Sequence, residues 1–340
     1  MRPEIDIDAA LQHGTPHRKP WGDNMVWIPG GTFRMGSNRH YPEEAPAHRV
    51  AVAGFWIDRS PVTNSQFAKF VTATGYLTLA EILPDPKNHP DALPGVLHAG
   101  SLVFRRPLER VQADRCGHWW TFTKGADWRH PLGPGSTIEG LGDHPAVHVA
   151  YQDALAYAQW AGKELPTEAE WEFAARGGED DAEFAWGDEL HPGGRMMANT
   201  WQGQFPWQNL AQDGYERTSP VAAFPQNDYG LYDMIGNVWE WTSDWFRPRH
   251  QPDAGKPCCI PKNPRGGAEH ESYDPCQPER RMPRKVLKGG SYLCAPNSCR
   301  RYRPAARRPQ PIGTSACDVG FRCIARNRPK LSLRSSRTTP

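Results

Sequence analysis

The sequence predicts an α+β domain in which irregular loops outweigh regular structure. Its 340 residues include 32 glycines, 34 prolines and 14 tryptophans, a composition that interrupts long helices and supplies large aromatic anchors for loops. Three short helical segments with capping signals stand beside brief alternating strands. No regular alternation of strands and helices and no repeat of fixed period runs along the chain. A single compact domain can bury a full core at this length.

Short strands dominate the first part of the chain. Residues 1–24 are polar and are expected to form an arm in front of the domain, which extends over 25–326. Apolar and small residues alternate from Met25 to Gly36 around a Gly-Gly pair, and this pattern predicts a β-hairpin. The apolar segment 55–58 predicts a further strand.

Three helices are predicted from capping pairs and terminal glycines. The first covers 63–75, where Gln66 completes a capping box and an apolar stripe faces the core. The second covers 151–162 and ends at its glycine. The third covers 167–177, with Glu170 as the capping partner.

The C-terminal half carries fewer regular signals. After Arg176 the pattern breaks into brief strands, turns and aromatic-rich loops. The stretch 247–284 is rich in proline, glycine and charge, so we expect an inserted loop rather than a core element. Residues 327–340 are expected to form a basic tail.

The charge balance gives no general reason to expect nucleic acid or a membrane as a partner. The formal net charge is +2 and the pI is near 8.1. Residues 1–8 include three acidic side chains where a secretory signal has a basic start and an apolar run, and no apolar run approaches about 18 residues. We therefore expect a cytoplasmic protein. One basic cluster is expected to be a solvated face, or else a rim that attracts substrate; it comprises Arg300, Arg301, Arg303, Arg307 and Arg308.

Several common enzyme signatures are missing from the sequence. It contains no GxGxxG, P-loop, G-x-S-x-G or H-E-x-x-H pattern, so nucleotide binding, serine hydrolysis and zincin chemistry lack support. Most of the eight cysteines are interpreted as reduced bystanders without paired C-x-x-C spacing: Cys116, Cys258, Cys259, Cys276, Cys317 and Cys323. Four histidines are expected to be exposed or hydrogen-bonded rather than metal ligands: His118, His130, His144 and His148.

The two remaining cysteines lie on either side of a short turn. Cys294 and Cys299 would point apart on a strand and would lie about 140° apart around a helix, so a turn has to bring them together. Pro296 presets φ and Asn297 tolerates the next position, which predicts a tight turn over 295–298. Such a pair can form a disulfide or share a soft metal ion. Two thiolates suffice for Cu(I), whereas Zn²⁺ takes about four ligands.

Several phrases of the sequence together resemble the formylglycine-generating enzymes, also called sulfatase-modifying factors. The resemblance covers roughly residues 25–325. Most of the phrases mark only the broader fold, and the thiol pair is the specific part. The phrases are Pro29-Gly-Gly-Thr-Phe-Arg-Met-Gly36, Val62-Thr-Asn-Ser-Gln-Phe67, Gly125-Ala-Asp-Trp-Arg-His-Pro131, Leu165-Pro-Thr-Glu-Ala-Glu-Trp-Glu172, Gly236-Asn-Val-Trp-Glu-Trp-Thr242, Lys288-Gly-Gly-Ser291 and Gly320-Phe-Arg322.

This resemblance implies a compact, loop-rich α+β domain distantly similar to C-type lectins. It implies an oxidoreductase that acts on a sulfur group with O2 as acceptor, converting a cysteine in a Cys-x-Pro-x-Arg motif of an unfolded sulfatase to Cα-formylglycine. The implied cofactor is copper, held as Cu(I) by Cys294 and Cys299, with the substrate thiolate as a third sulfur ligand. Hydrogen removal from the substrate Cβ gives a thioaldehyde, which water converts to the aldehyde.

Three further residues take their interpretation from the same resemblance. Ser291 and Trp239 are expected to line the substrate pocket. Ser298 departs from the family pattern, because many members carry tyrosine directly before the second cysteine. The missing phenol is expected to slow turnover or to alter the handling of O2.

Two sets of oxygen donors resemble family sites for structural calcium. Carboxylate, amide and carbonyl oxygens are the ligands that a hard cation prefers. From spacing alone, their aspartates fit the capping of loops better than a metal site, and the resemblance reverses that preference. The first set comprises the side chains of Asn199 and Asp213 with the carbonyls of Thr200 and Tyr215. The second set comprises Asp233, Gly236, Val238 and Glu240.

Three alternatives to this oxidase follow from the same sequence. A sulfoxide synthase of the ergothioneine type shares the fold but needs a helical bundle with histidine ligands, and only 24 residues precede Met25. A non-catalytic, lectin-like binding module predicts no paired thiols. A redox disulfide between Cys294 and Cys299 satisfies the turn equally well. The sequence leaves open which sulfatase is the partner.

Overall fold

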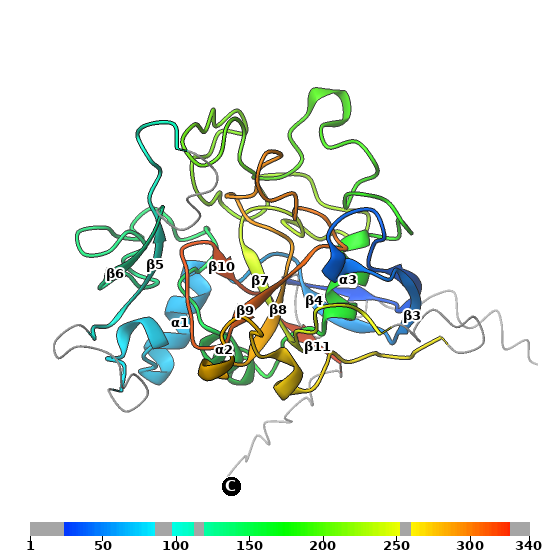
Figure 1. Cartoon of the computed structure of the whole chain (residues 1–340), viewed down its shortest axis with the longest axis horizontal. Coiled ribbons are helices and arrows are strands. Elements are labelled where there is room, and N and C mark those ends of the chain that lie inside the picture. Colours follow the sequence, from blue (N-terminus) through cyan, green and yellow to red (C-terminus); the bar gives the residue numbers. More distant parts are fainter. Residues whose placement is uncertain (1–23, 86–96, 112–118, 252–259, 327–340) are drawn as a thin grey trace, which may run out of the picture.

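A computed structural model of the chain describes residues 24–85, 97–111, 119–251 and 260–326. The predicted tail, nearly all of the predicted arm, and Cys116, His118, Cys258 and Cys259 lie outside these ranges. Within them the α+β prediction is confirmed, because short helices and strands follow one another without a regular order and long loops connect them (Figure 1).

The regular elements are all short. The α-helices are α1 (Asn64–Thr74), α2 (Tyr151–Trp160) and α3 (Glu168–Arg176). The 3-10 helices are η3 (Pro42–Glu44), η4 (Leu79–Glu81), η6 (Pro192–Gly194), η8 (Glu269–Ser272) and η9 (Pro278–Arg280). The strands are β1 (Met25–Ile28), β2 (Gly31–Met35), β3 (His48–Val52), β4 (Phe55–Asp58), β5 (Gly100–Phe104), β6 (Trp120–Lys124), β7 (Trp239–Trp245), β8 (Arg284–Lys288), β9 (Arg307–Pro311), β10 (Val319–Gly320) and β11 (Ile324–Ala325).

The strands form two sheets and two separate hairpins. The larger sheet has the order β10-β7-β8-β9, with β10 parallel to β7 and the other pairs antiparallel. The smaller sheet has the order β1-β4-β11, and the hairpins are β2-β3 and β5-β6. In Figure 1 the larger sheet lies at the centre, with α3 and β3 to one side and α1, β5 and β6 to the other.

The strands predicted between Met25 and Gly36 form, but the predicted hairpin between them is wrong. β1 pairs with β4, whereas β2 pairs with β3. Gly30 turns the chain from one sheet to the other with φ of 77°, and a Cβ added there would lie 2.6 Å from the carbonyl oxygen of Val52. Alternation predicts the existence of a strand but not its partner, because the partner is chosen by tertiary packing.

All three predicted helices are confirmed. The Thr63 hydroxyl accepts the Gln66 amide hydrogen at 3.3 Å, and the Gln66 side chain accepts the Thr63 amide hydrogen at 3.0 Å. Thr167 and Glu170 make the same reciprocal pair at the start of α3. Each helix is followed by a glycine with positive φ, namely Gly75, Gly162 and Gly177.

The buried core forms three clusters around these elements. The first contains Trp239, Trp241 and Cys294 together with the apolar faces of α1 and α2. The second joins α3 to β1, β2, β3 and β4. The third contains Tyr292 and Leu293. The segment that carries the thiols is therefore packed between the first and third clusters.

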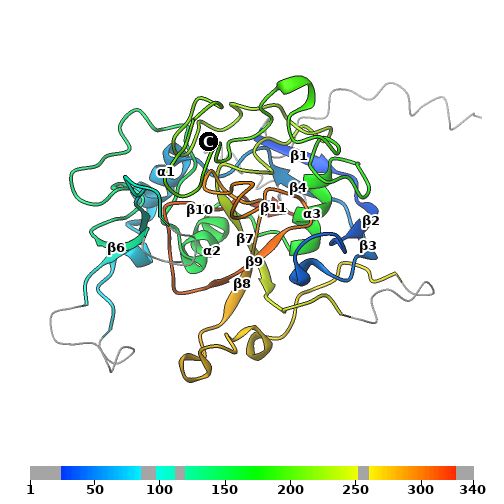
Figure 2. The ribbon, with the colours of Figure 1, turned by 45° about the horizontal axis from the view of Figure 1, so that its top comes forward.

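In its described ranges, 247–251 and 260–284, the predicted insertion lies beside β3 and β7. Its described part forms bridges from Lys262 to Ala51 and from Gly267 to Trp245. The loop after β8 projects among the long loops of residues 177–238, on the opposite side from η8 (Figure 1, Figure 2). Loops from distant parts of the sequence therefore surround the thiols.

Candidate active site

Two glycines lead the chain from β8 into the segment that carries the thiols. Gly289 and Gly290 have φ of 92° and 74°, in the left-handed region that favours glycine. A Cβ added to Gly290 would lie 3.0 Å from the Tyr302 amide nitrogen, so the segment folds closely back on itself. The Tyr292 amide then donates to the carbonyl of Asn237, which ties this segment to the loop before β7.

Two consecutive turns place the cysteines. The Cys294 amide donates to the Ser291 carbonyl at 2.9 Å, which closes the first turn. The Ser298 amide donates to the Ala295 carbonyl at 3.1 Å, and the predicted turn over 295–298 is confirmed. The Asn297 side chain both accepts from the Phe205 amide and donates to its carbonyl, each at 3.2 Å. The second turn is therefore held from outside as well as from within.

The turn brings the two thiols into contact. The Cys294 thiol donates to the Cys299 sulfur across 3.2 Å, and both are free cysteines. Burial raises the pKa of Cys294 well above its ordinary value. The hydrogen bond from Cys294 lowers the pKa of Cys299, with a further contribution from Arg301 and against the effect of burial. Within the pair, the thiolate form is therefore favoured at Cys299 rather than at Cys294.

A guanidinium group stands beside the half-buried Cys299. Arg301 Nη1 lies 3.9 Å from the Cys299 sulfur. Glu43 accepts from Arg301 Nη2 at 2.6 Å and from Nε at 3.1 Å. The Tyr41 ring lies under the guanidinium, 3.7 Å from its centre. Residues near the start of the domain thus fix a positive charge next to the exposed side of the thiol pair.

The expectation of a solvated basic face is wrong for two of its arginines. Arg303 is 1% exposed and makes a two-pronged ion pair with Glu44, with distances of 2.8 and 2.5 Å. Arg307 is 2% exposed and pairs with Glu168 at 2.7 Å. These buried charges pair with carboxylates more than a hundred positions away in the sequence. Spacing along the sequence does not reveal such distant partners. Arg300 is the exposed member of the cluster, with Glu183 as its partner at 3.1 Å.

Ser291 and Trp239 lie near the thiols but neither opens to solvent. Ser291 is 0% exposed and Trp239 is 1% exposed. The Ser291 hydroxyl donates to the Asp318 carboxylate at 2.9 Å and accepts from the Leu293 amide at 3.3 Å. The Trp239 amide donates to the Asp318 carbonyl at 2.8 Å. Both residues therefore support the turn from behind, and their place in a pocket wall stays a prediction.

Asp318 is a site residue that the sequence reasoning missed. Its carboxyl is fully buried, burial raises its pKa, and one of its oxygens has no hydrogen-bond partner among the described residues. Its position two residues before the Gly320-Phe-Arg322 phrase is the sequence signal that could have marked it. Glu43 and Tyr41 carried no comparable signal, because their contact with Arg301 spans most of the chain.

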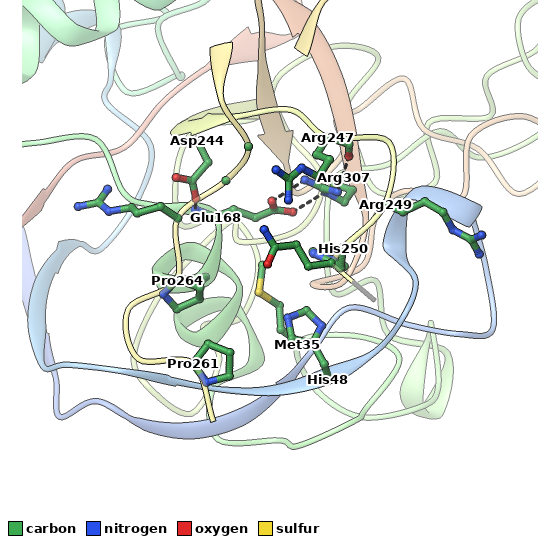
Figure 3. A pocket seen from close by; sticks show the side chains of 15 residues that line it. Met35, His48, Glu168, Asp244, Arg247, Arg249, His250, Pro261, Pro264 and Arg307 are labelled. Atoms are coloured by element: carbon green, nitrogen blue, oxygen red, sulfur yellow. Dashed lines mark hydrogen bonds and ion pairs between the residues drawn. The ribbon is translucent and has the colours of Figure 1, made fainter. Parts of the chain in front are cut away.

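A small cavity lies apart from the thiols, since neither cysteine lines it. Its volume is about 100 Å³, and it lies between the insertion, β3 and α3 (Figure 3). His48 and His250 face each other there with ring centres 4.9 Å apart, and burial lowers the pKa of His250. Arg307 on the cavity wall also donates to the Glu43 carbonyl at 3.1 Å. Glu43 thus connects the two places, because its carbonyl accepts from Arg307 and its carboxylate accepts from Arg301.

The structure brings together most of the first predicted calcium set. Asp213 accepts from the amides of Thr200 and Tyr215 at 3.2 and 3.0 Å. The Gln202 side-chain nitrogen contacts both the Thr200 carbonyl and, at 2.7 Å, the Asp213 carboxylate. The Asn199 side-chain oxygen is buried and meets no donor from the described part of the chain, and burial raises the pKa of Asp213. A buried amide oxygen without a donor, close in sequence to a carboxylate contact that includes no cation, fits a hard cation.

The second predicted calcium set fits a cation less well. Arg322 pairs with both carboxylate oxygens of Glu240 at 2.7 Å, and Trp171 donates to one of them at 2.8 Å. Arg322 also donates to the Asp233 carbonyl at 3.1 Å. Burial raises the pKa of Asp233 to about 6. Gly236 and Val238 lie in the loop between these acids, with Val238 1% exposed. A guanidinium already neutralises the stronger ligand of this set.

Other polar candidates are satisfied by the fold. His148 is buried and contacts the Ser101 hydroxyl at 2.7 Å and the Pro131 carbonyl at 2.9 Å. Cys317 and Cys323 are buried free thiols, as expected. Within the described ranges, no group of three or more histidine, cysteine, aspartate or glutamate side chains is arranged to hold a metal ion.

Comparison with known proteins places this architecture in a family. The sulfatase-modifying factor enzyme 1-like domain matches residues 12–327. The chain belongs to the sulfatase-modifying factor family. Within it, a formylglycine-generating enzyme of Mycobacterium tuberculosis is 52% identical over 302 residues, covering 88% of this chain and 97% of that one. One of Bos taurus is 44% identical over 308 residues, covering 90% and 75%.

Proteins of other names are also similar to this chain. A relative of Bos taurus named as an inactive C-alpha-formylglycine-generating enzyme 2 is 43% identical over 233 residues, covering 67% of this chain and 73% of that one. The solved structure of PvdO from Pseudomonas aeruginosa has a TM-score of 0.54 and 25% identity, covering 89% and 94%. Membership of the family therefore establishes the fold, and relatives of this fold carry both active and inactive names.

The described helices also bear on membranes. None of them combines the length and the apolar character needed to cross a bilayer.

Proposed function

We propose that this chain oxidises a cysteine in a Cys-x-Pro-x-Arg motif of an unfolded sulfatase to Cα-formylglycine, with O2 as the electron acceptor. The observation that supports this most directly is the contact between the Cys294 and Cys299 sulfurs at 3.2 Å. The turn that brings them together is held by its own backbone hydrogen bond and by the contact of Asn297 with Phe205. The names of the relatives from Mycobacterium tuberculosis and Bos taurus support the same reaction. The protein would thus be an oxidoreductase acting on a sulfur group.

The donor set of the thiol pair fits copper as the cofactor. Cys294 and Cys299 offer two soft sulfurs, and hydrogen bonding already favours the thiolate of one of them. No further cluster of metal-binding side chains lies in the described part of the chain, which suits a two-coordinate ion better than zinc. When bound, Cu(I) supplies one-electron redox chemistry and an affinity for a third thiolate.

The residues of this chain would bind and orient the substrate around Cys299. Cys299 is the more exposed thiol of the pair, whereas Cys294 is 2% exposed, so the substrate sulfur approaches from the Cys299 side. Loss of the thiol proton, of one proton from the adjacent methylene and of two electrons, which O2 accepts, leaves a thioaldehyde on the substrate. Water converts the thioaldehyde to the aldehyde with release of hydrogen sulfide. The buried Ser291 holds the turn in place from behind through its bond to Asp318.

We also propose that structural calcium occupies the first oxygen set, around Asn199 and Asp213. The unpartnered Asn199 oxygen supports it, and so does the Asp213 carboxylate, which has no cationic partner within hydrogen-bond distance among the described side chains. The second set around Asp233 and Glu240 has weaker support, because Arg322 already pairs with Glu240. A cytoplasmic location remains an expectation from the sequence.

Mass spectrometry of a peptide substrate tests the proposed reaction. The protein is loaded with Cu(I), given a Cys-x-Pro-x-Arg peptide in air, and the peptide is analysed for conversion of the thiol side chain to an aldehyde. Aldehyde is expected with the wild type and with Cys323→Ala, which removes a buried thiol outside the pair. It is expected to disappear in Cys294→Ala and Cys299→Ala. Absence of aldehyde in the wild type, with or without copper, would favour a non-catalytic binding module.

A further inference from the structure

The Arg301 guanidinium beside Cys299 is held in one orientation by two neighbouring side chains. Arg301 is 24% exposed at its side chain, and its partner Glu43 is 16% exposed, so both lie at the edge of the site rather than in open solvent. Glu43 and the Tyr41 ring together orient the guanidinium, while Nη1 reaches to 3.9 Å from the Cys299 sulfur. A freely solvated arginine would lose side-chain entropy in adopting such a geometry.

The neighbouring residues Arg300 and Arg303 form ion pairs away from the thiols. Arg303 is buried against Glu44, and Arg300 pairs with Glu183 on the outer side of the turn. The Tyr41 hydroxyl also accepts from the Arg300 backbone amide at 3.1 Å, which fixes the residue that precedes Arg301. Of the described arginines that directly follow the turn, Arg301 is the one in hydrogen-bonding contact with a thiol sulfur.

We propose that Arg301 is the counter-charge of the sulfur centre and favours entry of the substrate as a thiolate. This inference rests on the proposed function. Cu(I) with two thiolates carries one negative charge, and a third thiolate adds a second, while the proton of the substrate thiol leaves to solvent. A fixed guanidinium at the rim offsets that added charge. Glu43 reduces the offset but lies behind Arg301, so the cation remains the nearer charge to the sulfur.

A pair of peptides separates this role from ordinary contacts with the rest of the peptide. One peptide carries Cys-x-Pro-x-Arg and the other carries serine in place of the reacting cysteine, so only the first adds a thiolate. Affinities are measured by calorimetry without oxygen on the Cu(I)-loaded full chain, so that no turnover occurs. Arg301→Met is expected to weaken binding of the cysteine peptide about tenfold and to change binding of the serine peptide by less than about twofold.

Two further variants control for charge and for local structure. Arg301→Lys keeps the positive charge and is expected to restore most of the affinity for the cysteine peptide. Arg300→Met removes an exposed arginine of the same turn, paired with Glu183, and is expected to leave both affinities unchanged. Competition with a Cu(I) chelator checks that each variant still binds copper, and circular dichroism checks that it is folded.

The outcomes distinguish this inference from the proposed function. An equal loss for both peptides, or no loss for either, in Arg301→Met would overturn the role of Arg301 while leaving the oxidase intact. If the wild type itself fails to prefer the cysteine peptide, the sulfur centre does not recruit the substrate thiol. That result would count against the proposed function.

Discussion

Ser291 and Asp318 form a hydrogen bond of 2.9 Å directly behind the thiol turn. The Ser291 carbonyl accepts the Cys294 amide, so this bond connects a buried carboxylate to the backbone of one of the two thiols. Asp318 is in turn fixed by its carbonyl, which accepts from the Trp239 amide of β7. The position of Cys294 thus depends on a chain of contacts that begins in the central sheet.

Removal of either partner of this bond should destabilise the protein through the same interaction. Ser291→Ala and Asp318→Ala are each expected to cost about 1–3 kcal/mol of unfolding free energy in urea titrations. The double variant should cost clearly less than the sum, because both changes break one bond. Asp318→Asn retains an acceptor oxygen and should recover most of the stability. Strict additivity of the two single variants would contradict the coupling.

A tyrosine at position 298 should accelerate aldehyde formation. Ser298 is exposed, and its backbone amide closes the turn onto Ala295, so a larger side chain meets no steric obstacle there. We expect Ser298→Tyr to raise the rate of peptide oxidation several-fold while the unfolding free energy changes by less than about 0.5 kcal/mol. Ser298→Phe lacks the phenol and should not reproduce the gain. A rate equal to that of the wild type would remove any role for the departure at this position.

Chelation should weaken the fold through the first oxygen set. In the wild type, a calcium chelator is expected to lower the melting temperature by several degrees, because Asp213 and the Asn199 oxygen lose their shared cation. Asp213→Ala should be less stable from the start and should no longer respond to the chelator. Asp228→Ala, which changes an exposed carboxylate in a nearby loop, should respond as the wild type does. A chelator without effect on the wild type would argue for loop capping alone.

Acid should destabilise the protein through His148. Burial lowers the pKa of His148 from 6.5 to about 4, so the folded state binds fewer protons than the unfolded state between these values. Stability should therefore be full above about pH 6.5 and fall by up to about 3 kcal/mol as the pH drops to about 4. His148→Asn tolerates the positive φ of 58° and should remove this slope from urea titrations across that range. An unchanged slope in the variant would assign the acid sensitivity to other groups.

Local signals predicted the local structure. The capping pairs Thr63/Gln66 and Thr167/Glu170 fixed where two helices begin, because both partners lie within one turn of helix. Pro296 and Asn297 predicted the turn over 295–298 for the same reason. The pairing of β1 with β4 instead of β2 could not be predicted, since the strand signal carries no information about which edge is free.

The candidate site shows the same difference between local contacts, which could be predicted, and distant contacts, which could not. The contact between Cys294 and Cys299 could be predicted, because the two residues are five positions apart with a predicted turn between them. The contacts that surround it do not, because Glu43 reaches Arg301 across 258 positions and Asp318 reaches Ser291 across 27. The burial of Arg303 and Arg307 was missed for the same reason. The amino-acid types predicted their charge but not the distant carboxylates that neutralise it.

The two adjacent glutamates of η3 pair with arginines that are synthesised near the end of the chain. Glu43 and Glu44 leave the ribosome early, whereas their partners Arg301 and Arg303 follow 258 and 259 positions later. A nascent chain that ends before these arginines lacks the ion pairs that connect the segment after the thiols to the start of the domain. The surroundings of the thiol pair are therefore completed only after both ends of the domain have met.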